Sequence, residues 1–168
     1  MSCLGVLFAV GKDIVDKMKK MPLESLPGYI SEELEELYFE EYPEQTFELD
    51  KSWDAMHRAL TDGSLSFDSE GAPALAILGG ERLYYDEDHT DYIITVKTPE
   101  QAKTVYEALS ALTDKEFKKR YNAIPDEEYG EFKSAEDLEY TLEYLHDSLS
   151  FWRYASEHGL WVLFTADQ

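Results

Sequence analysis

The sequence predicts an α+β fold: one domain over residues 1–168, with a small mixed or antiparallel sheet packed against several helices. The chain of 168 residues is 43% hydrophobic and 14% aromatic, enough to bury a substantial core. Two almost wholly apolar segments, residues 3–10 and 160–164, lie near its two ends. Such segments are typical of strands buried on both faces, so we expect both to be central in one sheet. No internal repeat or linker divides the chain.

The segment after the first strand predicts two helices. Residues 12–21 place their apolar side chains on one helical face. Pro27 and Gly28 are typical of a turn, and Ser31 is expected to cap a second, glutamate-rich helix. The simplest interpretation of these glutamates is that they form the solvent-exposed face of the helix.

A brief extended segment is expected over residues 46–49, and Asp50 is expected to cap the helix that follows. Gly63 ends that helix. Residues 64–80 are rich in serine and glycine around an apolar centre, which predicts a loop that contains a short buried helix.

Residues 82–85 and 92–96 flank a polar turn and predict a hairpin. Thr98 is then expected to cap a helix, because Pro99 occupies the first helical position that proline favours.

The last third of the chain predicts two further helices and the final strand. Thr113 and Glu116 match a capping box for a short helix. A loop is expected over residues 122–133. Ser134 is then expected to cap the longest helix, which ends near His158 and carries two apolar stripes, so it should be buried on two sides and lie against the sheet.

The charge of the chain restricts its partners. There are 36 acidic and 15 basic residues, a net charge of -21, which repels nucleic-acid phosphates and anionic lipids. A basic protein partner fits this charge, although a merely solvated acidic surface also explains it. The single cysteine, Cys3, excludes an intramolecular disulfide and favours a cytoplasmic location. Neither a signal peptide nor a membrane-spanning segment is expected.

Four stretches carry a resemblance to a known family. They are LDKSWDAMHRALTDG, ALAILGGERL, VKTPEQAKTVYEALSALTDKEFKKRY and FWRYASEHGLWVLF. Together they resemble the YfbM-like family of bacterial domains of unknown function. The resemblance implies a small cytoplasmic α+β domain and supplies no reaction.

The first of these stretches contains the candidate ligand-binding residues. Helical spacing places Trp53, Met56, His57 and Leu60 on one face. That face is either a core face with a buried histidine or the edge of a pocket. The pocket hypothesis would use these residues: Lys51, Trp53, Asp54, His57 and Thr61.

A weaker candidate is the polar turn DEDHTD. Its carboxylates and imidazole could bind a cation through Asp86, Asp88, His89 and Asp91. The turn lacks the glycine and the distant glutamate of an EF-hand loop, so a solvated turn is the alternative.

No phosphate loop, dinucleotide fingerprint, zinc-protease motif or nucleophile elbow occurs in the sequence. We therefore expect no cofactor and name no catalytic residue. The favoured hypothesis is a non-catalytic acidic module, immunity- or inhibitor-like, that binds a basic protein partner. One alternative is a small-ligand binder or enzyme with a pocket around Trp53 and His57. A third hypothesis is that these residues serve only packing and solvation and form no site.

Overall fold

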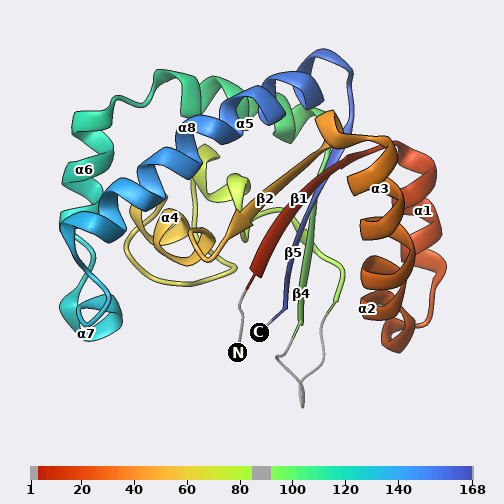
Figure 1. Cartoon of the computed structure of the whole chain (residues 1–168), viewed down its shortest axis with the longest axis horizontal. Helices are drawn as coiled ribbons and strands as arrows, with labels where there is room; N and C mark the ends of the chain where they lie inside the picture. The colour runs from red at the N-terminus through yellow and green to blue at the C-terminus, as the bar shows by residue number, and fades with distance from the viewer. Residues whose placement is uncertain (1–3, 85–91, 168) are drawn as a thin grey trace.

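A computed structural model describes residues 4–84 and 92–167 of the chain, which form an antiparallel sheet with helices on both faces (Figure 1). The strand order is β2-β1-β5-β4-β3. The strands are β1 (Leu4–Val10), β2 (Thr46–Asp50), β3 (Glu81–Arg82), β4 (Tyr92–Lys97) and β5 (Trp161–Asp167). The predicted α+β class is confirmed.

The two terminal strands lie in the same sheet, as the sequence predicted, and the structure shows that they pair with each other from Leu4 to Val10. Leu4 lies opposite Asp167 at one end of the ladder, and Val10 lies opposite Trp161 at the other. β5 is the middle strand of the sheet because β4 pairs with its other side. β1 and β5 therefore lie side by side in the interior of the sheet.

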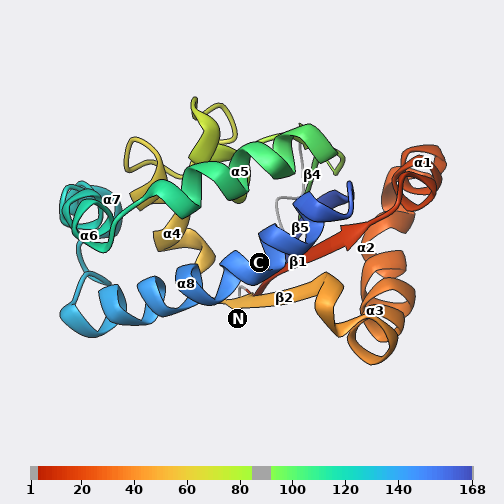
Figure 2. The ribbon, with the colours of Figure 1, turned by 90° about the horizontal axis from the view of Figure 1, so that it is seen from above.

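Two groups of helices cover the sheet (Figure 2). One face carries α1 to α3, and the other carries α4, α5 and α8, with α6 and α7 at its outer end. The helices are α1 (Lys12–Lys20), α2 (Leu26–Tyr29), α3 (Glu35–Glu41), α4 (Trp53–Leu60), α5 (Pro99–Ala111), α6 (Asp114–Asn122), α7 (Asp126–Tyr129) and α8 (Ala135–Glu157). Short 3-10 segments lie at Leu23–Ser25, Pro43–Gln45 and Ala72–Ala76, and a π-helix at Ile30–Leu34.

Each face of the sheet has its own hydrophobic core, because successive strand residues point to opposite faces. Leu7 and Phe164 belong to the core under α4, α5 and α8. Phe8 and Leu163 belong to the core under α1 to α3. Burial on both faces explains why β1 and β5 are apolar at almost every position.

Three predicted helix starts are confirmed by their caps. The Thr98 side chain accepts a hydrogen bond from the Gln101 backbone N–H, and the Gln101 side chain completes a capping box. Thr113 accepts from the backbone N–H of Glu116, and Ser134 accepts from that of Asp137 at 2.9 Å. The long helix α8 packs in the core that contains Phe164, with Trp152 buried.

Four local predictions were wrong. The loop expected over residues 122–133 contains the short helix α7, which begins after Pro125 and has acidic residues in its first turn. Pro27 and Gly28 lie inside α2, since proline is tolerated in a first helical turn. Ser31 is not a cap: the chain stays helical from Leu26 to Glu41, and the Ser31 hydroxyl donates to the Gly28 carbonyl. Asp50 ends β2 with a φ of 52°, and Ser52 is the N-cap residue of α4.

Candidate functional site

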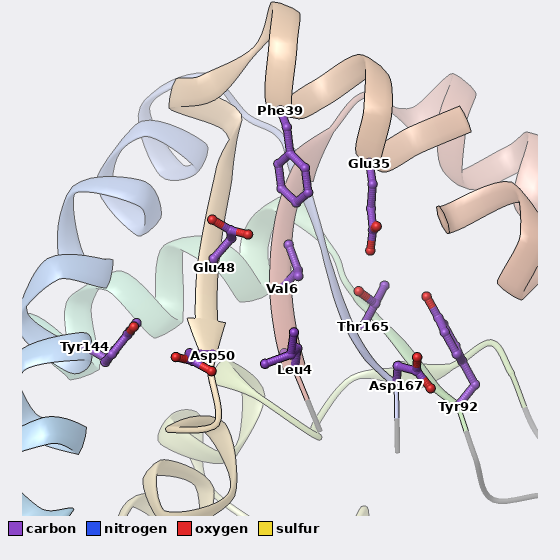
Figure 3. Close-up of a pocket in the computed structure, with 11 residues that line it drawn as sticks. Leu4, Val6, Glu35, Phe39, Glu48, Asp50, Tyr92, Tyr144, Thr165 and Asp167 are labelled. Carbon is purple, nitrogen blue, oxygen red and sulfur yellow. The ribbon is translucent and has the colours of Figure 1, made fainter. Parts of the chain in front are cut away.

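A pocket of about 440 Å³ lies where α3 leaves one end of the sheet uncovered (Figure 3). β1, β2, β4 and β5 all contribute to its floor. Its lining residues are Leu4, Gly5, Val6, Glu35, Phe39, Glu48, Asp50, Tyr92, Tyr144, Thr165 and Asp167.

The register of the sheet sets the floor of this pocket. Val6 lies opposite Glu48 on one side and Thr165 on the other, so these three residues form one row across the sheet. Asp167 lies opposite Leu4 and Tyr92 and forms a second row. Carboxylates therefore stand at both ends of the pocket floor, on β2 and on β5.

A further pocket carboxylate, Asp50, lies beside an irregularity in the β1–β2 ladder. Val6 is opposite Glu48, yet its neighbour Gly5 is opposite Asp50, so the register shifts between Gly5 and Val6. Asp50 then takes a positive φ, which the short polar side chain of aspartate tolerates better than most. Glu48 and Asp50 both line the pocket from β2.

Helix α3 supplies the wall. Glu35 and Phe39 are four residues apart and point from one face of α3 toward the sheet (Figure 3). Phe39 is held by stacking on Phe8, with ring centroids 6.0 Å apart. Opposite this wall, Tyr144 of α8 points toward Asp50.

The pocket has a negative potential. None of the described residues that line it is lysine, arginine or histidine, whereas four are carboxylates. Burial, and then the charges of Glu48 and Asp167, raise the pKa of Glu35. Burial likewise raises the pKa of Tyr92, so its hydroxyl stays protonated at neutral pH. A positive charge in the pocket would relieve this repulsion.

The size and spacing of the carboxylates select the kind of cation. No three histidine, cysteine, aspartate or glutamate side chains in residues 4–84 and 92–167 are placed to hold one metal ion. The four carboxylates instead line one shared space together with aromatic residues. Phe39, Tyr92 and Tyr144 add aromatic rings, which attract ammonium and guanidinium groups.

The residues predicted from the KSWDAMH stretch are distributed over the core and surface and do not form one site. Trp53 is 2% exposed and His57 is 0% exposed, and neither lines the pocket. The Lys51 backbone N–H donates to the Tyr140 hydroxyl. Asp54 accepts from Arg58 at 2.7 Å, and the Thr61 hydroxyl donates to the His57 carbonyl.

His57 is a neutral core histidine. Its Nε2 lies 3.0 Å from the Ser66 carbonyl oxygen, which can only accept, so we assign the ring proton to Nε2. Nδ1 is buried and has no hydrogen-bond partner among the described residues. Burial is the main cause that lowers the pKa of His57 to about 4.

Trp53 packs against the strand position of Gly5, which belongs to the floor of the pocket. Any Cβ on Gly5 would lie 2.7 Å from the indole Cδ1, so the ring occupies the space directly against that strand position. Gly5 is itself a pocket residue. The helix that follows Asp50 therefore fixes the far side of the same part of the sheet.

The cation candidates Asp86, Asp88, His89 and Asp91 lie outside the described residues. The pocket residues Glu35, Glu48 and Asp167 were not predicted as site residues. Glu48, an acidic residue within a strand pattern, was the available signal. Glu35 resembled the other glutamates of its helix.

Comparisons with known proteins identify a family and a fold. The model of a family described as a domain of unknown function (DUF1877) matches residues 1–165. The crystal structure of YfbM, a protein of unknown function from Escherichia coli, is similar with a TM-score of 0.66 at 18% sequence identity. The match covers 97% of this chain and 99% of that chain. Among curated proteins, none matches.

Proposed function

Since the chain belongs to the DUF1877 family of domains of unknown function, we propose its function from the pocket: a non-catalytic module that binds a basic protein partner through a cationic side chain. One observation carries the proposal. Four carboxylates and three aromatic rings line a single pocket of about 440 Å³ that has no basic lining residue. The occupant we propose is an arginine or lysine side chain, as an immunity- or inhibitor-like role requires.

The dimensions and the net charge support this assignment. Pockets that bind small groups commonly measure about 300 to 1,000 Å³, and this one lies in that range. The net charge of -21 accelerates the approach of a basic protein and disfavours nucleic acid and anionic membranes. No helix in the described residues is long and apolar enough to cross a membrane. A cytoplasmic location, which the single cysteine favours, belongs to the same proposal.

The test is calorimetric titration with a tetra-arginine peptide. We expect the double variant Glu48→Gln/Asp167→Asn to lose at least tenfold in affinity, because two of the four pocket carboxylates become neutral. The matched control is Glu24→Gln/Glu107→Gln, which removes the same charge from two exposed positions outside the pocket. Equal weakening by both double variants would mean that the peptide senses only net charge, and the pocket would then have no role.

The alternative function, a ligand or catalytic site around Trp53 and His57, gains no support from the geometry. Both side chains are at most 2% exposed. A histidine that exchanges protons with a substrate has to reach the substrate, directly or through one water.

A further inference from the structure

Strand β2 is one end of the five-stranded sheet, with helix α8 beside it (Figure 1, Figure 2). Its inner side pairs with β1, from Thr46 opposite Phe8 to Asp50 opposite Gly5. In the described part of the chain, no strand pairs with its outer side. Unpaired N–H and C=O groups at such an edge are a template for a further strand. The opposite end of the sheet is β3, which has two residues only.

Both charged residues of β2 are acidic, so they oppose pairing with an acidic chain but not with a basic one. Its five residues, TFELD, include neither the lysine nor the proline that commonly protects an edge strand. Glu48 is exposed, and Thr46, Phe47 and Asp50 are half-buried. Of the five residues of β2, only Leu49 is buried.

Charge decides which kind of chain fits. If β2 paired with β2 of a second copy, Glu48 and Asp50 would face the same acidic residues, and like charges across strands are destabilising. Each copy also carries a net charge of -21. A strand with basic residues opposite Glu48 would form favourable cross-strand pairs instead.

We propose that an extended segment of the basic partner adds to the sheet beside β2, with one arginine or lysine side chain entering the pocket. This inference rests on the proposed function and deepens it by naming the conformation of the partner. Alternate side chains of the added strand project to the face of Glu48 and the pocket. Those between them project to the other face, where Phe47 packs on Tyr144 with ring centroids 6.3 Å apart. The preferred segment has basic residues at every second position and apolar residues between them.

The experiment uses a capped hexapeptide of alternating arginine and valine. Two derivatives carry backbone N-methyl groups, one on every arginine and the other on every valine. In an edge strand only alternate N–H groups face the partner. We expect one derivative to bind at least tenfold more weakly than the parent and the other to bind nearly as well. Backbone amides of β2 should also exchange more slowly with solvent when the parent peptide is bound.

Three other results would overturn strand addition. Equal binding by all three peptides, or binding of argininamide alone, would overturn strand addition while leaving the pocket proposal intact. Failure of both the hexapeptide and argininamide to bind would overturn the two proposals together. A dimer of the free protein that protects the β2 amides would assign the edge to a second copy and overturn the inference.

Discussion

His57 shows how one buried side chain makes stability depend on pH. Its pKa is lowered from 6.5 to about 4 in the folded protein, chiefly by burial, so folding favours the neutral ring. The contribution of His57 is therefore fully present above pH 6.5 and is lost as the pH falls toward 4, by about 3 kcal/mol. We expect His57→Gln to be less stable than the parent at pH 8 by about 1 to 3 kcal/mol. The gap should narrow at pH 4.5. Urea unfolding of both proteins at the two pH values measures this, and a constant gap would contradict it.

Lys97 is a second buried titratable residue, and it has no ion-pair partner among the described residues. Its Nζ donates to the Ile77 carbonyl at 2.5 Å and to the Thr95 hydroxyl at 2.6 Å. Burial holds the pKa of Lys97 well below its usual range.

The folded state therefore favours the neutral amine, and the parent protein should gain stability as the pH rises from 7 toward 10. We expect Lys97→Met, which keeps the apolar stem, to be at least as stable as the parent at pH 7. This advantage should shrink at pH 9.5. Thermal unfolding at both pH values tests it, and strong destabilisation by methionine at pH 7 would show that the two hydrogen bonds outweigh the burial of the amine.

At the scale of elements, β1 and α4 are in close contact where Gly5 meets the Trp53 indole. An added methyl group on Gly5 would meet the indole at 2.7 Å and Phe164 at 3.0 Å. We expect Gly5→Ala to destabilise the protein by about 1 to 3 kcal/mol, as overpacking of a core does. Trp53→Ala should cost about 3 to 5 kcal/mol. In the double variant the alanine at position 5 should cost less than it does alone, and a cycle of denaturant-unfolding free energies detects this coupling. Strict additivity would show that the two side chains do not compete for space.

Elements with local signals were predictable from the sequence, and the pocket was not. Continuous apolar runs marked β1 and β5, and the side chains of Thr98 and Ser134 marked two helix starts. Glu35 and Asp167 meet only because α3 packs over the strand that ends the chain. Asp50 resembled a helix cap because the sequence does not show that it is the last residue of β2, beside a register shift. Tertiary convergence and strand register are therefore what sequence patterns left undetermined.

The excess of acidic residues acts on the whole molecule. At a net charge of -21 the carboxylates repel one another in the compact state. Added salt should screen this repulsion and so stabilise the fold. We expect millimolar calcium, magnesium and manganese to raise the melting temperature by similar small amounts. A selective, saturable rise that Asp86→Ala or Asp88→Ala abolishes would instead establish a metal site in the DEDHTD turn.

The central claim is that the pocket between α3 and the sheet holds one cationic side chain. Its most direct test is a titration of isotope-labelled protein with argininamide, followed by amide chemical shifts, with uncharged citrullinamide as the matched control. We predict saturable shifts at Glu35, Glu48 and Thr165 with argininamide and none with citrullinamide. Equal shifts with both compounds, or argininamide shifts scattered over acidic surfaces away from these residues, would contradict the account.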